Sequence, residues 1–156
     1  MKKYILIILT LVPILAGWLI NVTLLVPVLG ELMFYVFPIL VLVFWFRLGG
    51  WYAQTDWATL PAILTGNAMG ILSIAIYMWQ FVALDEVSRN VGLAFWSQMY
   101  SIGTLGYFLG GIVTLFFRSQ AASHTMQVIC LASMIAVFSF GFFRNRDCSA
   151  RKKSAT

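Results

Sequence analysis

The polar residues that could do chemistry in this chain lie inside apolar stretches. Asn67 stands beside a run of glycines in one stretch, and Gln98 and Ser101 stand in the next. An amide surrounded by hydrocarbon needs a hydrogen-bond partner, which either a neighbouring helix or a bound solute can supply. We therefore treat Asn67, Gln98 and Ser101 as candidate contacts for a small polar solute. An interhelical hydrogen bond is the alternative, and the favoured role for Asn67.

Glu31 is the acidic residue whose environment is least certain from sequence. It follows Pro27 and Gly30, at the start of an apolar stretch that also contains Pro38. If that stretch enters the membrane without crossing it, Glu31 becomes a buried carboxylate that can contact a solute. We favour the ordinary position, in which the carboxylate lies at a helix N-terminus and interacts with the helix dipole.

The sequence lacks the residue patterns of familiar enzymes and metal sites. His124 is the single histidine, and Cys130 and Cys148 are too widely spaced for a CxxC motif. No HExxH, GxSxG or glycine-rich phosphate loop occurs, and Asp56 and Asp85 fall at opposite ends of one apolar stretch. We expect no catalytic residue, no metal and no cofactor.

The composition identifies the class of protein. Hydrophobic residues make up 62% of the 156 residues and charged residues only 10%, against roughly 45–50% and 25% in an ordinary soluble domain. This excludes a soluble globular enzyme and a disordered chain. The net charge of +5 does not indicate nucleic-acid binding, because most Lys and Arg residues lie near the two ends of the sequence. The composition predicts a polytopic membrane protein.

Five apolar stretches are long enough to be helical membrane segments, since about 20 residues span the bilayer core. The fold class expected is an all-α integral membrane protein, a five-segment transmembrane helix bundle. Pro38 makes the second stretch the candidate for an incomplete crossing, so four full crossings plus one re-entrant segment is the alternative. We favour a tight hairpin at residues 27–31 followed by a proline-kinked crossing. The expected segments are residues 4–25, 30–46, 60–84, 91–117 and 125–143.

The positions of Lys and Arg favour an even number of crossings, because these residues concentrate on the cytoplasmic side. Five crossings divide them almost equally between the two sides. If one early segment does not cross, only Arg47 and Arg118 lie outside, and all the others lie inside. Hydropathy thus favours five crossings, whereas charge favours four.

Small residues recur at spacings of three and four in the third and fourth segments, which places them on one helix face. Such faces allow close helix packing within a chain or against a partner. We expect the two segments to pack on each other through these faces, with a partner interface as the alternative. The residues are Ala62, Gly66, Gly70, Gly103, Gly106 and Gly110.

Residues 144–156 form a basic segment after the last apolar stretch. We expect a disordered cytoplasmic tail whose cations contact anionic lipid headgroups, each contributing about 1 kcal/mol near such a surface. The cations concerned are Arg144, Arg146, Arg151, Lys152 and Lys153.

These features predict a multi-pass protein of the cell membrane, in particular the bacterial cytoplasmic membrane. The function expected first is that of a non-enzymatic accessory or interaction subunit, which binds itself or another membrane protein through its glycine faces. The alternative is a small transporter or channel subunit that binds a polar or amphipathic solute near Asn67, Gln98 and Ser101. The lipid bilayer is the expected partner in both cases.

Overall fold

The computed structural model describes residues 3–23, 26–117 and 123–154, and its regular elements in these ranges are helical. Two short π-helical turns, η1 and η3, and one 3-10 turn, η2, interrupt the α-helices. In chain order the elements are α1 (Lys3–Leu9), α2 (Val12–Thr23), α3 (Leu29–Tyr52), α4 (Thr59–Met78), η1 (Trp79–Ala83), η2 (Glu86–Ser88), α5 (Val91–Met99), η3 (Ile102–Gly106), α6 (Tyr107–Phe117) and α7 (Ser123–Ser154).

Four helical stretches are long and apolar enough to cross a membrane, which confirms the expected all-helical membrane fold. They are Tyr4–Thr23, Leu29–Tyr52, Thr59–Ala83 and Ser123–Arg146. A fifth candidate consists of two helices, Val91–Met99 and Ile102–Phe116, whose axes differ by 55°. The chain therefore has up to five membrane segments, and the apolar outer faces of its helices suit contact with lipid.

The interrupted segment is the fourth, whereas from sequence an incomplete crossing was the less favoured alternative for the second. Pro38 lies inside a continuous α3, as membrane helices often tolerate. In the fourth segment, Ser101 and Thr104 alternate with Gly103 and Gly106. Glycine is a poor helix former, and hydroxyl side chains compete for backbone carbonyls. Four such residues within six positions weaken the helix more than one proline does.

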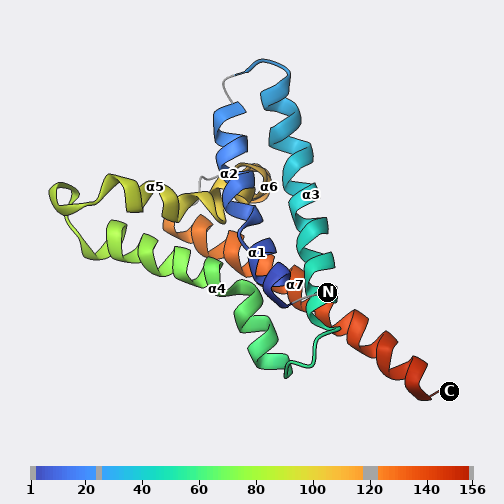
Figure 1. Ribbon diagram of the computed structural model, residues 1–156. Helices are drawn as coiled ribbons and strands as arrows, with labels where there is room; N and C mark the ends of the chain where they lie inside the picture. The colour runs from blue at the N-terminus through green and yellow to red at the C-terminus, as the bar shows by residue number, and fades with distance from the viewer. Residues whose placement is uncertain (1–2, 24–25, 118–122, 155–156) are drawn as a thin grey trace.

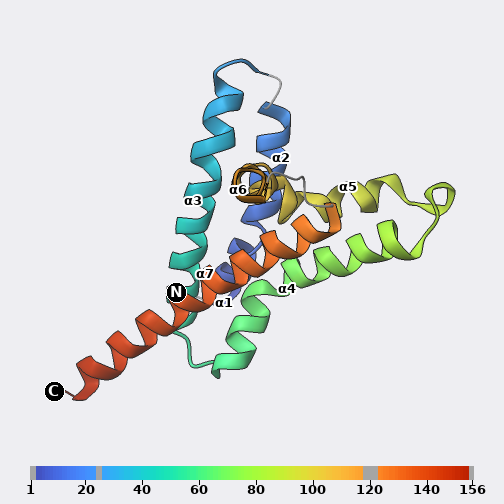
Figure 2. The same cartoon turned by 180° about the vertical axis from the view of Figure 1, so that it is seen from behind.

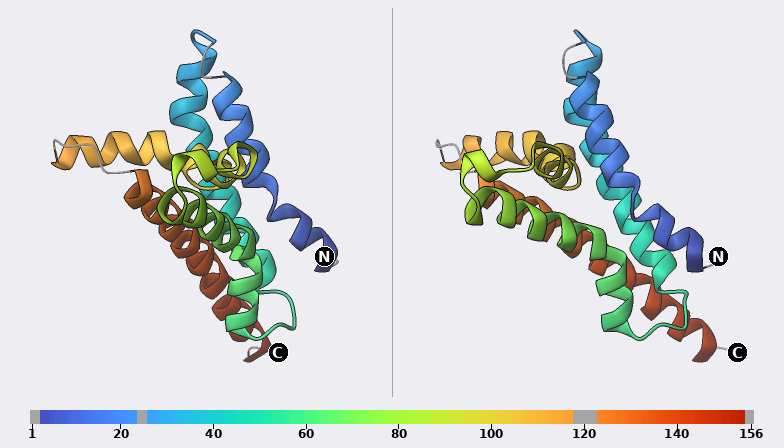
Figure 3. Two further views of the ribbon diagram at one scale, coloured as in Figure 1. Left: turned by 90° about the vertical axis from the view of Figure 1, so that its left-hand side faces the viewer. Right: turned by 60° about the vertical axis from the view of Figure 1, so that its left-hand side comes forward.

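The helices form an open bundle whose two ends differ (Figure 1). The start of α1, the connection from α3 to α4 and the end of α7 lie at one end, and the turn from α2 to α3 lies at the other (Figures 1 and 2). The turn from α4 to α5 extends away from the termini as a second arm. Helix α6 is seen end-on in Figure 1 and projects to one side of the bundle in Figure 3, across the direction of α7.

Helices α3 and α7 cross at close range because glycines face backbone at the crossing. A Cβ atom on Gly49 would overlap the carbonyl oxygen of Phe138, and one on Gly141 would overlap the carbonyl oxygen of Phe46. Small residues allow this approach, so dispersion contacts replace the hydrophobic force that lipid does not provide. This crossing is the closest backbone contact between two full-length spans.

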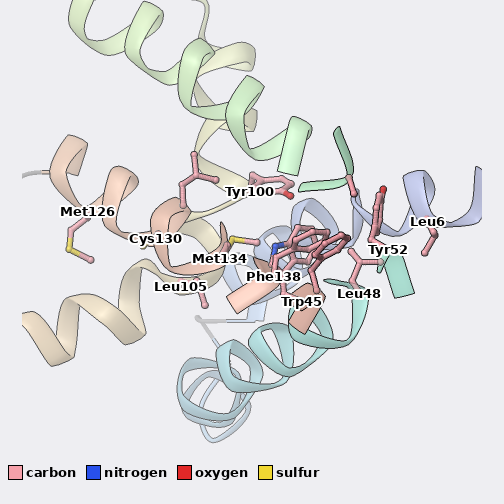
Figure 4. Close-up of a cluster of buried hydrophobic side chains, with 13 residues drawn as sticks. Leu6, Trp45, Leu48, Tyr52, Tyr100, Leu105, Met126, Cys130, Met134 and Phe138 are labelled. Atoms are coloured by element: carbon pink, nitrogen blue, oxygen red, sulfur yellow. The ribbon is translucent and has the colours of Figure 1, made fainter. Parts of the chain in front are cut away.

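Aromatic rings fill the space next to this crossing (Figure 4). The ring of Trp45 lies 6.0 Å from that of Tyr100 and 6.2 Å from that of Phe138, and Tyr52 lies 5.4 Å from Phe138. The four side chains are buried. Tilted and edge-on arrangements at these distances are favourable for aromatic pairs. The rings form a dry core between α3, α7 and the residue that follows α5.

Helix α7 continues through the segment for which we expected disorder. Its backbone remains helical to Ser154, beyond the expected boundary at residue 144. Arg144 lies over the ring of Phe46 at 5.8 Å, and Arg146 donates a hydrogen bond to the hydroxyl of Thr59. These contacts tie the first turn of the basic segment to α3 and α4. Contact of the basic segment with lipid headgroups stays a prediction.

Candidate solute site at the bend of the fourth segment

Side chains supply hydrogen bonds to backbone carbonyls around the bend between α5 and α6. The carbonyl of Ser97 accepts hydrogen bonds from Ser73 Oγ of α4 (2.6 Å) and from Gln127 Nε2 of α7 (3.0 Å). Thr104 Oγ1 lies 2.9 Å from both the Tyr100 and the Ser101 carbonyl oxygens. Irregular backbone is tolerated inside a membrane protein when neighbouring side chains replace the lost hydrogen bonds. Two neighbouring helices, α4 and α7, thus hold the bend in place together with its own Thr104.

A cavity of about 240 Å³ lies beside this bend, bounded by the end of α2 and the start of α7. Polar side chains line it together with sulfur and aliphatic groups, as is usual for small-molecule sites. Its lining comprises Asn21 of α2, Gln98 and Met99 of α5, Ile102, Gly103 and Gly106 of η3, Tyr107 of α6, and Ser123 and Met126 of α7.

The two amide side chains of the cavity are held by their own helices. Asn21 Nδ2 donates to the carbonyl of Gly17 (2.7 Å) and lies 3.8 Å from Met99 Sδ, and Gln98 Nε2 donates to the carbonyl of Ala94 (3.3 Å). Both contacts to carbonyls reach back one helical turn. Both side chains are half-buried. The amide groups are therefore positioned before any ligand arrives.

Two glycines bring α2 against the bend. A Cβ atom on Gly17 would overlap the carbonyl oxygen of Met99. A Cβ atom on Gly103 would lie 3.1 Å from the carbonyl oxygen of Gln98 and 3.3 Å from Asn21 Nδ2. Any larger side chain at either position would separate the two walls of the cavity, so these glycines fix its width.

The structure separates the predicted solute contacts. Gln98 lines the cavity. Asn67 is 1% exposed in the core, where it accepts a hydrogen bond from Trp45 Nε1 (3.2 Å) and donates one to the carbonyl of Ile63 (2.9 Å). This is the interhelical role that we favoured for Asn67. Ser101 is buried at the bend, next to the cavity in sequence but outside its lining as described.

Glu31 is exposed in the first turn of α3. It lines a shallow apolar hollow together with Pro27, Val28 and Tyr35, apart from the amide side chains. A carboxylate in the first turn interacts favourably with the helix dipole. Its position therefore agrees with the ordinary interpretation.

The small-residue faces of the third and fourth segments do not meet each other. Ala62, Gly66 and Gly70 are buried. A Cβ atom on Gly66 would overlap the ring of Phe138 in α7, and one on Gly70 would lie 2.6 Å from both Leu131 and Tyr100. The small-residue face of α4 therefore packs on α7 and on Tyr100, not on the glycines of the fourth segment. The third and fourth segments do pack on each other as expected, since α4 lies against α5, but not through the two glycine faces.

The glycines of the fourth segment have three different environments. Gly103 faces α2, as described above. A Cβ atom on Gly106 would lie 2.5 Å from Ile102 of the same turn, whereas the nearest atom to one on Gly110 is Met126 Cε at 3.9 Å. These glycines therefore belong to the bend and to the wall of the cavity, and they do not form one continuous face for packing against another helix.

Sequence reasoning missed Gln127, Gly17, Gly49 and Gly141, and it did not select Asn21. A single glycine in an apolar stretch carries no signal of what it faces. Gln127 lies one turn after Ser123, and this polar pair within an apolar helix was the available clue. The roles of these residues could not be predicted from sequence, because each of them contacts a helix that is distant in sequence.

Comparison with known proteins adds no assignment: no family model, no curated protein and no solved structure matches the chain significantly. Within the described ranges, no group of three or more His, Cys, Asp or Glu residues is placed to hold a metal ion.

Proposed function

We propose that this chain is a small membrane protein that binds a polar or amphipathic solute at the bend of its fourth segment, as a transporter or channel subunit does. The observation that carries the proposal is the cavity lined by Asn21 and Gln98 at an interrupted helix. Interrupted helices in transporters place backbone and polar groups around a substrate within the membrane. Polar residues inside a membrane are expensive, and their convergence on a cavity favours a functional role.

We further propose that the fourth segment is re-entrant, so that it enters and leaves on the same side. Helix α5 has 9 residues and α6 has 11, so each is about 14–17 Å long, well short of the bilayer core of about 30 Å. The chain would then cross the membrane four times. Both of its ends would lie on one side, as the positions of α1 and α7 in Figure 3 suggest.

The distribution of cations supports this topology. With the fourth segment re-entrant, Arg89 and Arg118 are the only Lys or Arg residues placed on the side opposite the ends. Most Lys and Arg residues thus still lie on one side of the membrane, as with an even number of crossings in the sequence analysis. The segment that does not cross is the fourth, however, and not an early one. By the positive-inside rule, the side that carries the ends is cytoplasmic. The cations on it are Lys2, Lys3, Arg47, Arg144, Arg146, Arg151, Lys152 and Lys153.

In this topology the cavity opens away from the cytoplasm. Asn21 lies in the last turn of α2 and Ser123 is the first residue of α7. Both are therefore at the ends of their spans that lie opposite the chain termini. A solute would reach the cavity from the non-cytoplasmic side.

The interaction-subunit hypothesis has less support from this geometry. Gly66 and Gly70 are covered by α7 and by Tyr100, so a partner cannot dock on them without opening the bundle. Gly111 on α6 is exposed, and a Cβ atom there would have no neighbour within 4 Å. A partner surface would have to be sought on α6.

A thiol-reactivity experiment tests whether the cavity admits water. Met126 lines the cavity, whereas Met134 of the same helix is fully buried in the dry core. In a background with Cys130→Ala and Cys148→Ser, Met126→Cys should react with methyl methanethiosulfonate at least about tenfold faster than Met134→Cys, because an apolar environment suppresses the reactive thiolate. Equal rates would contradict the proposed function and favour the interaction subunit.

A further inference from the structure

The orientation of the two amides indicates which solutes the cavity accepts. A backbone carbonyl can only accept a hydrogen bond, so Asn21 must present its NH2 group to Gly17, and Gln98 must present its NH2 group to Ala94. The two amides therefore cannot be flipped without setting oxygen against oxygen. Each side chain uses an N–H of its NH2 group in a bond to its own helix.

The amide oxygens remain available as acceptors. In the part of the chain that the structure describes, neither Asn21 Oδ1 nor Gln98 Oε1 accepts a hydrogen bond from the protein. Both side chains belong to the cavity wall, one from α2 and one from α5. The cavity lining thus includes two side chains that each keep an acceptor oxygen without a protein partner, which suits a ligand with two hydrogen-bond donors.

The charge of the lining limits the ligand further. None of the described residues that line the cavity is an Asp, Glu, Lys, Arg or His. An ion bound there would lose hydration without meeting an opposite charge, which is strongly unfavourable. Met99, Ile102 and Met126 provide apolar contact for a short carbon skeleton. A neutral solute avoids the penalty and uses both kinds of surface.

We infer that the cavity selects small uncharged solutes that donate two or more hydrogen bonds, such as primary amides and short polyols, through Asn21 Oδ1 and Gln98 Oε1. This inference rests on the proposed function, since it names the substrate class of the same site. It adds a chemical preference that the presence of a cavity alone does not imply.

Protection of Met126→Cys from methyl methanethiosulfonate tests the preference with two isomeric probes. Propanamide carries two N–H donors and N,N-dimethylformamide carries none, although both have the same atoms. Propanamide should protect the cysteine at a concentration about tenfold lower, the difference that two hydrogen bonds of ordinary net strength provide. Equal protection by the two isomers, or stronger protection by N,N-dimethylformamide, would overturn the inference.

Variants at Gln98 separate recognition from structure. Gln98→Met keeps the length of the side chain but has no strong acceptor, so the preference for propanamide should fall to about threefold or less. Gln98→Glu keeps acceptor oxygens and adds a charge, so methylammonium, which should not protect the parent protein, should protect this variant. Failure of methylammonium to protect Gln98→Glu would contradict the placement of Gln98 Oε1 at the solute.

The two proposals fail in different ways. If Met126→Cys does not react even without solute, the water-accessible cavity is absent and the proposed function fails. If it reacts but does not distinguish propanamide from N,N-dimethylformamide, the cavity exists and only the donor preference is wrong. The same pair of isomers tested on Met134→Cys measures any effect of solute on the reagent itself.

Discussion

Two places where helices approach closely have opposite chemistry in this protein. At the crossing of α3 and α7, Gly49 and Gly141 bring backbone against backbone, and aromatic rings close the surrounding space. At the bend of the fourth segment, Gly17 and Gly103 also permit close approach. There the space beside the glycines remains open and is lined by amides.

The difference shows that a glycine's role depends on the regularity of the helix it faces. Helices α3 and α7 satisfy their own backbone at the crossing, so close contact produces a dry interface. At the bend, side chains add hydrogen bonds to the backbone: Ser73 and Gln127 donate to the Ser97 carbonyl, and Thr104 lies within hydrogen-bond distance of the Tyr100 carbonyl. The amides that line the cavity, Asn21 and Gln98, are distinct from the polar side chains that hold the bend.

The largest effect should come from filling the crossing. Gly141→Leu places a side chain where the carbonyl of Phe46 lies, so α3 and α7 must separate, and we expect a loss of about 3 kcal/mol or more in unfolding free energy. This loss of unfolding free energy can be measured by unfolding the variant in a gradient of sodium dodecyl sulfate and following tryptophan fluorescence.

Gly111→Leu is the matched control, since no atom lies within 4 Å of a Cβ at that position. It should change the unfolding free energy by less than about 0.5 kcal/mol. A similar loss in Gly141→Leu and Gly111→Leu would mean that the crossing is no more tightly packed than the lipid-facing surface.

An intermediate effect should come from removing both donors to the Ser97 carbonyl. Ser73→Ala and Gln127→Leu alone each leave one donor in place. Together they leave a buried carbonyl without either donor, so the double variant should lose about 1 kcal/mol more than the two single variants combined. A double-mutant cycle measures this coupling. Strict additivity would argue that the two side chains do not share the carbonyl.

The smallest effects should come from polar atoms in the dry core. Trp45→Phe removes the hydrogen bond to Asn67 and should cost about 1 kcal/mol of unfolding free energy. Tyr52→Phe should be neutral or slightly stabilising, because the buried hydroxyl of Tyr52 has no hydrogen-bond partner within the described residues. If Tyr52→Phe proves more damaging than Trp45→Phe, the core is not dry around that hydroxyl.

The sequence predicted the class of fold because composition and segment length determine it directly. It did not predict which segment is interrupted. Pro38 is a visible helix breaker that the bundle tolerates, whereas the residues around Ser101 act together and depend on Ser73 and Gln127 from other helices. Gln98 was predicted as a solute contact and lines the cavity. The interhelical role was favoured for Asn67, but its partner Trp45 could not be predicted, because that contact is a tertiary property.

The central claim is that the fourth segment turns back to form the cavity. Single cysteines in place of Ser88, before the segment, and Ser123, after it, test this directly, since both positions are exposed. In intact cells, with Cys130→Ala and Cys148→Ser, a membrane-impermeant maleimide should label both from the outside. Labelling of only one would show that the segment crosses the membrane, and would contradict the four-crossing account.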